Sequence, residues 1–284
     1  MDLARSVNEM RQWRRVARRS PLALFPTMGA LHEGHFSLAR QAREDSELVA
    51  VSIFVNPLQF GPAEDLASYP RDLDRDLELL ESLGVDVVFA PQPADFTPPQ
   101  RRTTVHVAGL TDRLEGASRP GHFDGVTTIV TKLFSIVQPD TAYFSRKDFQ
   151  QLVVVQAMVR DLDLPVRIVE CDFVRDHDGL ALSSRNANLS TQERRRALAL
   201  SAALSAAVTS WDGDADVARA RLVEALAAGP GVELDYAEIA DPDTLEPLHG
   251  IHRGPAQALI AAWVGSTRLI DNARLPAVAS ATVT

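Results

Sequence analysis

Two histidines three positions apart, His32 and His35, are the first residues whose types and spacing could do chemistry. They lie in the stretch PTMGALHEGH, residues 26–35, which follows a predicted strand and opens a predicted helix. A helix N-terminus suits phosphates, and Gly29 and Gly34 let the backbone approach a ligand closely. We therefore expect the imidazoles to bind phosphate oxygens and to stabilise charge as pyrophosphate departs. Two capping histidines, or a metal pair that lacks a convincing third ligand nearby, are the alternatives.

Neutral amide side chains follow the next predicted strand, in the segment VNPLQFG at residues 55–61. Asn56 and Gln59 supply donors and acceptors that suit the hydroxyl and carboxylate groups of a small substrate. An ordinary turn built on Pro57 and Gly61 explains the same segment equally well.

The segment SRKDFQQ, residues 145–151, is a third strand-to-helix junction, and it contains one of only two lysines beside 27 arginines. Where arginine is so common, Lys147 marks a place that needs a compact, flexible ammonium, such as one that follows a transferring phosphoryl group. Asp148 can accept from ribose hydroxyls or cap the helix. Lys132 lies inside a predicted helix, and we interpret it as a surface residue.

Two further stretches carry charged or hydroxyl side chains that could hold anions or a metal. In DGLALSSRN, residues 178–186, two serines and Arg185 form a plausible anion clamp, or simply a hairpin with a solvated arginine. In YPRDLDRD, residues 69–76, one carboxylate could serve a magnesium ion, although such a run more commonly marks a helix start.

An alternation of short apolar runs and helical segments positions these residues. It predicts a doubly wound parallel sheet of the α/β class, covered on both faces, whose ligands bind at the carboxyl ends of the strands. We expect residues 1–20 to form a surface helix and residues 91–102 a surface loop. The predicted strands are 22–25, 48–55, 85–90, 141–144 and 166–171, and the predicted helices are 35–43, 72–83, 126–137 and 149–161.

The pattern changes near residue 175, where we place a domain boundary. Helices at 191–208, capped by Ser190 or Thr191, and at 216–228 precede short strands at 232–239, 256–264 and 267–270. Helices followed by strands indicate a smaller α+β domain. Residues 277–284 are expected to form a loose tail.

The amino-acid composition of the chain excludes several classes of function. The 29 basic and 38 acidic side chains leave a net charge of −9, which argues against a nucleic-acid partner but allows a local anion site. The longest apolar runs are too short to span a membrane, and without a secretory signal we expect a cytoplasmic location. The single cysteine, Cys171, excludes an intrachain disulfide and is expected in the core.

Taken together, the chemistry-bearing stretches resemble one family, the pantoate–β-alanine ligases or pantothenate synthetases. The first motif is related to the HIGH-type signature of class I nucleotidyltransferases and aminoacyl-tRNA synthetases. The matching segments occur in the family's order over roughly residues 20–272: PTMGALHEGH, VSIFVNPLQFG, YPRDLDRD, RPGHFDGV, KDFQQL, DGLALSSRN and GSTRLIDN.

The resemblance implies a Rossmann-like domain over residues 1–174, which binds nucleotide and pantoate, and a smaller α+β lid domain over 175–284. It implies a homodimer that uses ATP and Mg²⁺ to condense (R)-pantoate with β-alanine through an enzyme-bound pantoyl adenylate. AMP and pyrophosphate leave. A tRNA-linked activity is a distant alternative, because no tRNA-binding extension is evident.

The resemblance also implies roles for particular residues. The catalytic set is His35, as general acid, with His32, Lys147 and Arg185. Gln59 and Gln151 would hold pantoate, with Gln59 also near β-alanine, and Asp76 is the magnesium-associated carboxylate. The ATP-binding residues would be Met28, Gly29, His32, Gly34, His35, Ser145, Lys147, Asp148, Val174, Leu182, Ser183, Ser184 and Arg185.

One departure from the family's pattern stands beside the critical lysine. Ser145-Arg146 replaces the usual Gly-Glu, which adds a Cβ near the nucleotide and reverses a charge. This change keeps two alternatives open. One is a paralogue that adenylates another small hydroxy acid or uses another amine, and the other is a catalytically silent nucleotide-binding protein.

Overall fold

The computed structural model describes residues 1–62 and 64–278, and the predicted tail beyond residue 278 lies outside them. The chain divides into two compact units. The first contains Met1–Arg146 and Val154–Asp172, and the second contains Lys147–Val153 together with the chain from Phe173 onward. The principal change of unit therefore falls between Asp172 and Phe173. No sequence signal indicated that Lys147–Val153 belongs with the second unit.

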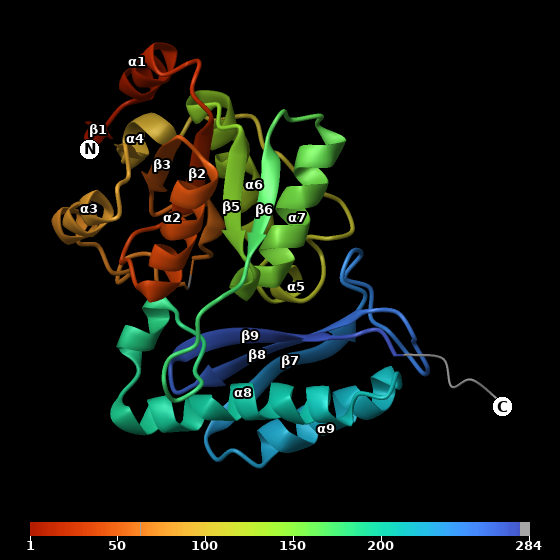
Figure 1. Cartoon of the computed structure of the whole chain (residues 1–284). Coiled ribbons are helices and arrows are strands. Elements are labelled where there is room, and N and C mark those ends of the chain that lie inside the picture. Colours follow the sequence, from red (N-terminus) through yellow and green to blue (C-terminus); the bar gives the residue numbers. More distant parts are fainter. Residues whose placement is uncertain (63, 279–284) are drawn as a thin grey trace. The chain divides into compact units, whose positions relative to one another are not determined.

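The first unit is built on a six-stranded sheet in which every pair of neighbouring strands is parallel (Figure 1). The strand order is β1-β4-β3-β2-β5-β6, so the winding direction reverses between β2 and β5. Ligands bind at such a switch point, beyond the carboxyl ends of the strands. The strands are β1 (Asp2–Ala4), β2 (Leu22–Thr27), β3 (Leu48–Ile53), β4 (Val87–Phe89), β5 (Thr141–Ser145) and β6 (Arg167–Cys171).

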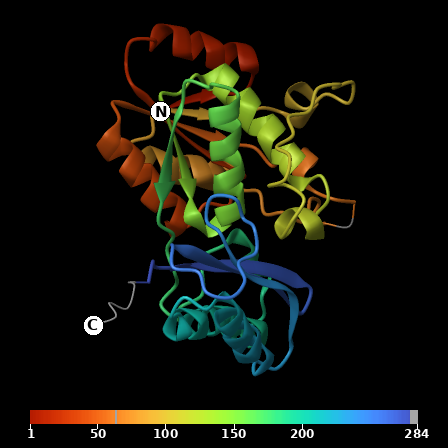
Figure 2. The same ribbon diagram turned by 90° about the vertical axis from the view of Figure 1, so that its right-hand side faces the viewer.

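Helices lie on both sides of this sheet (Figure 2). On one face Leu38 and Ala42 of α2 and Leu80 of α3 pack against Phe25 and Val51, because the buried strands are apolar on both faces. The helices are α1 (Val7–Val16), α2 (Glu33–Asp45), α3 (Leu73–Ser82), α4 (Pro93–Phe96), α5 (Glu115–Ser118), α6 (His122–Val137) and α7 (Phe149–Asp161), with 3-10 turns η1 (Pro57–Gln59) and η2 (Arg146–Asp148).

The second unit packs two helices against a three-stranded antiparallel sheet of order β7-β8-β9. Alanines such as Ala203 and Ala258 are fully buried in its core, where their small side chains let helix and sheet approach closely. Ser190 caps α8 through a capping box with Glu193, as one of the two candidates predicted. The elements are η3 (Ser184–Asn188), α8 (Thr191–Ser210), α9 (Ala215–Ala227), β7 (Val232–Ala240), β8 (Ala256–Val264) and β9 (Thr267–Leu275).

The α/β class and the α+β second unit are confirmed, but one local prediction was wrong. The segment predicted as a surface loop contains α4, whose Phe96 is fully buried with its ring edge-on to Phe54 and Phe89. The helix predicted within residues 1–20 is confirmed as α1, and it is preceded by the strand β1, which was not predicted. Three residues are too few to show strand periodicity.

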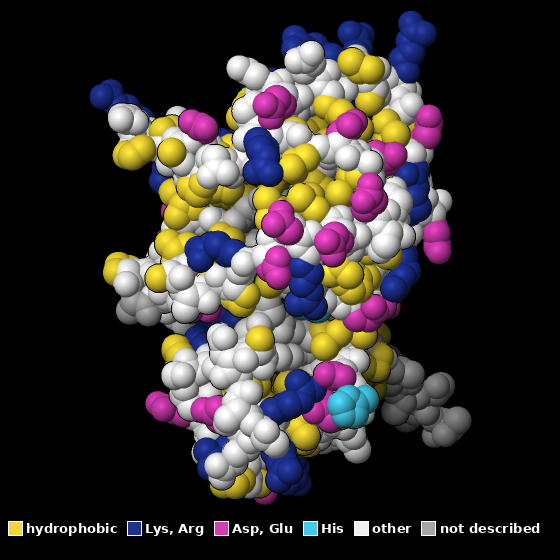
Figure 3. Space-filling model, turned by 90° about the vertical axis from the view of Figure 1, so that its left-hand side faces the viewer, with side chains coloured by type: hydrophobic (Ala, Val, Ile, Leu, Met, Phe, Trp, Pro, Cys, Tyr) yellow, Lys and Arg dark blue, Asp and Glu magenta, His cyan; other side chains and the backbone are white. Residues whose placement is uncertain are grey.

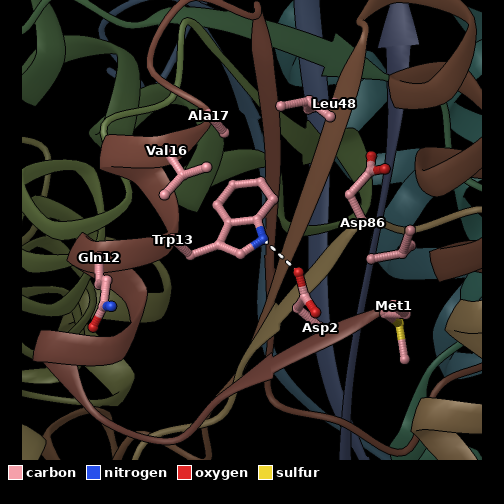
Figure 4. A pocket seen from close by; sticks show the side chains of 9 residues that line it. Met1, Asp2, Gln12, Trp13, Val16, Ala17, Leu48 and Asp86 are labelled. Carbon is pink, nitrogen blue, oxygen red and sulfur yellow. Dashed lines mark hydrogen bonds between the residues drawn. The ribbon is translucent and has the colours of Figure 1, made fainter.

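Within residues 1–62 and 64–278, every helix is too short or too polar to cross a lipid bilayer. Acidic and basic side chains are interspersed over the face shown in Figure 3. A cavity of about 580 Å³ opens at the amino ends of the strands, lined by Asp2, Trp13, Leu48 and Asp86 among others (Figure 4). Trp13 donates to Asp2 across it at 2.8 Å. The predicted site residues of this unit lie at the carboxyl ends of the strands instead.

Candidate active site

The loop between β2 and α2 carries the two histidines. Gly29 has φ of +87° and Ala30 has φ of +53°, so the chain reverses through left-handed backbone before the helix begins. A Cβ at Gly29 would lie 3.0 Å from a carboxylate oxygen of Asp76 and 3.2 Å from Ile53. This position therefore needs glycine both for its conformation and for its space.

Both imidazoles cap the start of α2. His32 Nδ1 accepts from the Gly34 N–H at 3.2 Å, and His35 Nδ1 accepts from the His32 N–H at 3.3 Å. The rings lie 4.1 Å apart between centroids. Because each Nδ1 accepts, each neutral ring carries its hydrogen on Nε2. The capping interpretation is thus confirmed for Nδ1, while phosphate binding through Nε2–H stays a prediction.

Asp76 braces this loop from α3. Its Oδ2 accepts from the Ala30 N–H and its Oδ1 accepts from the Leu31 N–H, both at 2.9 Å. The residue is only 2% exposed. Burial raises the pKa of the carboxyl, against the lowering effect of the two hydrogen bonds.

Both oxygens of Asp76 hold the loop without a metal ion, and the magnesium role predicted for this carboxylate stays a prediction. In the part of the chain that the structure describes, no group of three His, Cys, Asp or Glu side chains could hold a metal ion. Asp76 is a structural brace of the histidine loop.

The turn η1 brings Gln59 beside the histidine loop. Gln59 Nε2 donates to Met28 Sδ at 3.4 Å, and Gln59 Oε1 accepts from Asn56 Nδ2 at 2.9 Å. Asn56 also caps the turn by accepting from the Leu58 N–H. The segment therefore forms the predicted turn, and the same turn places the amides of Asn56 and Gln59 at the edge of the sheet.

The junction after β5 shows where the unusual Arg146 goes. Its side chain is 6% exposed, and its Nη1 lies 2.8 Å from Glu170 Oε1 on the neighbouring strand β6. The reversed charge beside Lys147 thus has a partner within the same sheet. Ser145, at the end of β5, is half-buried.

Lys147 belongs to the second unit, where β9 holds its backbone. Its carbonyl accepts from Asn272 Nδ2 at 3.0 Å, and Asn272 Oδ1 in turn accepts from Gln257 Nε2 at 2.8 Å. The Lys147 ammonium lies 3.0 Å from Asp148 Oδ1. Neither Asn272 nor Gln257 was among the predicted site residues, although the matching segment GSTRLIDN contains Asn272.

The stretch 174–185 forms a hairpin in the second unit. Arg175 and Ala181 pair as an antiparallel bridge, and the Leu182 N–H donates to the Val174 carbonyl at 3.1 Å. Ser183 caps η3 by accepting from the Arg185 N–H at 3.3 Å. The hairpin interpretation is confirmed, and the anion clamp of Ser183, Ser184 and Arg185 stays a prediction.

Lys132 is a structural residue rather than a solvated one. Its Nζ donates to the Phe96 carbonyl at 2.6 Å and lies 4.8 Å from the centre of the Phe96 ring. Burial lowers its pKa, with a further contribution from Arg101. The lysine thereby ties α4 to α6.

The structure gathers the first-unit candidates at the carboxyl ends of β2, β3 and β5, on both sides of the switch point. These are Met28, Gly29, His32, Gly34, His35, Gln59 and Ser145. The other candidates belong to the second unit, in η2, near the start of α7 and in the hairpin: Lys147, Asp148, Gln151, Val174, Leu182, Ser183, Ser184 and Arg185.

A doubly wound sheet, with a glycine-bearing loop and paired imidazoles at its switch point, defines a Rossmann-like α/β protein. The model of the family described as "Pantoate-beta-alanine ligase" matches residues 2–274. The chain belongs to this family of enzymes.

Curated relatives and solved structures agree with this family. The chain is 51% identical over 277 residues to the pantothenate synthetase of Moorella thermoacetica, covering 96% of this chain and 98% of the relative. The Geobacter sulfurreducens pantothenate synthetase matches with the same identity and coverage. The pantothenate synthetase structure from Thermus thermophilus matches with a TM-score of 0.90 and 47% identity, covering 96% and 99% of the two chains.

A second structure carries ligands. It is the pantoate-beta-alanine ligase of Francisella tularensis, described as complexed with "Beta-gamma ATP and Beta-alanine". It matches with a TM-score of 0.79 and 31% identity, covering 96% of this chain and 97% of that chain. The family and the fold predicted from the motifs are therefore confirmed.

Proposed function

We propose that this enzyme condenses pantoate with β-alanine at the expense of ATP, releasing AMP and pyrophosphate through a bound pantoyl adenylate. The observation that carries the proposal is the contact of Gln59 with Met28, which joins an amide-bearing turn to the paired-histidine loop in a chain of this family. Residues 1–174 would bind nucleotide and pantoate, and residues 175–284 would act as a lid.

The first proposed step is transfer of the adenylyl group. A pantoate carboxylate oxygen attacks the α-phosphorus of ATP, and the bond from that phosphorus to the pyrophosphate oxygen breaks. His32 and His35 would donate hydrogen bonds from Nε2 to the phosphates. The general-acid role of His35 requires the protonated ring, in which Nδ1 also carries a hydrogen and releases the His32 N–H. Lys147 and Arg185 would neutralise the charge that moves onto pyrophosphate.

The second step forms the amide. The neutral amine of β-alanine attacks the acyl carbon of the adenylate, AMP leaves with the electrons of the acyl–oxygen bond, and the nitrogen gives up a proton. Gln59 and Gln151 would hold the acid by hydrogen bonds from their amides. An adenylate is already activated, so the protein supplies positioning and charge stabilisation and needs no covalent nucleophile.

The Arg146–Glu170 pair removes the reason to prefer another acid over pantoate. The charge reversal at Arg146 was the reason to consider a paralogue with other substrates. Since Glu170 partners it at 2.8 Å within the sheet, the change has a local explanation that does not require another substrate. Nothing in the comparisons favours the paralogue or the silent binding protein.

Pantoate-dependent exchange of pyrophosphate into ATP is the experiment that tests this function. With purified protein, ATP and Mg²⁺, we expect exchange that requires pantoate and pantothenate formation once β-alanine is added. Absence of exchange at saturating pantoate would reject the proposal. A panel of other hydroxy acids and amines decides between pantoate and a paralogue's substrates.

We further propose a cytoplasmic homodimer, in which Mg²⁺ arrives as the counter-ion of ATP rather than as a metal held by Asp76. The family resemblance supports the dimer, and the two loop-bound oxygens of Asp76 support the second point. Sedimentation equilibrium reports the oligomeric state directly.

Replacing Asp76 with asparagine should raise the KM for ATP about tenfold, because one of the two loop N–H groups then faces an amide that cannot accept from it. The KM for pantoate should stay within about twofold. Steady-state kinetics measures both, with Asp74→Asn, an exposed carboxylate of the same helix, as the control. Equal effects from the two variants would contradict the bracing role of Asp76.

A further inference from the structure

The matching segment RPGHFDGV received no function above, yet its side chains hold the backbone of the turn that carries Gln59. The carbonyl oxygen of Gln59 accepts from His122 Nδ1 at 2.8 Å and from Arg119 Nη2 at 3.3 Å. Two side chains of one short segment thus converge on a single main-chain oxygen some 60 positions earlier in the chain.

The hydrogen bonds fix the state of His122. Its Nδ1 faces a carbonyl, which only accepts, so Nδ1 carries the hydrogen. Its Nε2 lies 3.3 Å from Arg119 Nη1, which only donates, so Nε2 accepts. The ring is therefore neutral and held in one tautomer. Burial and the neighbouring Arg119 charge lower its pKa to about 4, which agrees with a neutral ring.

Arg119 is itself held in place. Its Nε donates to Glu64 Oε1 at 3.1 Å and its Nη2 to Glu64 Oε2 at 2.5 Å. Glu115 lies 3.7 Å away on the preceding turn. With a side chain only 13% exposed, the guanidinium has a fixed direction from which to orient His122.

The backbones also meet closely on the other side of the turn. A Cβ on Gly125 would lie 2.2 Å from the Leu58 carbonyl oxygen and 2.6 Å from the Gln59 nitrogen. Asn56 Nδ2 donates to the Gly125 carbonyl at 3.1 Å. The first turn of α6 therefore seats against η1, and only glycine permits that approach.

We infer that His122, oriented by Arg119, is a positioning residue for Gln59 in the recognition of the acid and amine substrates. His122 and Arg119 fix the direction of the Gln59 carbonyl and therefore the orientation of the peptide plane that follows Gln59. That orientation limits the directions in which the Cα–Cβ bond of Gln59 can point. Asn56 and Met28 then hold the far end of the same side chain. This inference rests on the proposed function of Gln59.

The inference makes a selective prediction for two variants of His122. In His122→Phe the ring stays but both hydrogen bonds are lost, so the KM for pantoate and for β-alanine should rise at least about tenfold. The KM for ATP and kcat at saturation should stay within about twofold. In His122→Asn the amide nitrogen replaces Nδ1 as donor to Gln59, and most of the loss should be recovered.

The assay combines pantoate-dependent exchange with AMP release in the complete reaction. His106→Phe is the matched control, since His106 is exposed and pairs with Asp124 on the same helix as His122. If His122→Phe fails to fold, Arg119→Lys serves instead, because it keeps the charge but loses the fork to Glu64 and the donor to Gln59. It should raise the same two KM values.

Three outcomes would overturn the inference: equal changes in all three KM values, no recovery with His122→Asn, or variants indistinguishable from wild type. An inactive wild-type enzyme would instead reject the proposed function, and the inference with it. Active wild type with unaffected variants rejects the inference alone.

Discussion

Alanine in place of Lys147 should lower turnover at least about tenfold, because removing one preorganised charge from a developing oxyanion typically costs more than that. The position of the Lys147 side chain depends on its backbone, which Asn272 holds by a hydrogen bond of 3.0 Å to the Lys147 carbonyl. The measurement is kcat for AMP formation at saturating ATP, pantoate and β-alanine.

Lys132→Ala is the matched control, since these are the only two lysines in the chain. Lys132 bonds the Phe96 carbonyl at 2.6 Å, so its loss should lower the melting temperature and leave kcat within about twofold. Equal effects on kcat from both substitutions would show that lysine scarcity does not mark the active site. Lys147→Arg should restore part of the activity, because charge is kept without the compact geometry.

Replacing Arg146 with glutamate, the residue that the family resemblance leads us to expect here, should destabilise this protein. The substitution sets a second carboxylate against Glu170. The Arg146 side chain is 6% exposed and that of Glu170 is 31% exposed, so loss of this partly buried ion pair costs about 2 kcal/mol. The first unit should melt roughly 4 to 8 °C lower. Differential scanning calorimetry gives the temperature and reveals whether the two units melt separately.

Exchanging both residues tests whether the ion pair is the cause. The double variant Arg146→Glu with Glu170→Arg restores opposite charges and should recover most of the lost stability. Additive destabilisation in the double-mutant cycle would mean that the two side chains do not interact significantly. The wild-type ion pair would then not explain the unusual Arg146.

The fold could be predicted largely because its central strands are buried on both faces. Runs such as Leu22–Phe25 and Val87–Phe89 are continuously apolar, and such runs alternate with amphipathic helices. The misses have physical causes as well. Phe96 is buried by rings of Phe54 and Phe89 from elsewhere in the chain, which local composition cannot reveal.

Part of the candidate site could likewise be predicted from the sequence, and part could not. His32, His35 and Gln59 could be found because their types follow predicted strand ends, where ligands bind. The contacts that hold the site together could not be predicted, since each joins a side chain to a backbone group far away in sequence. Asp76 reaches Ala30, His122 reaches Gln59 and Asn272 reaches Lys147, and none of these pairings leaves a periodic signal.

The scarcity of lysine has a practical consequence for labelling chemistry. An amine-directed acylating reagent finds only the N-terminus, Lys132 and Lys147 on this chain. The ammonium of Lys132 is already bonded to the Phe96 carbonyl, and its pKa is lowered by burial. A mass increase on the peptide that contains Lys147, and its suppression by nucleotide, would therefore report occupancy of the site in the unaltered protein.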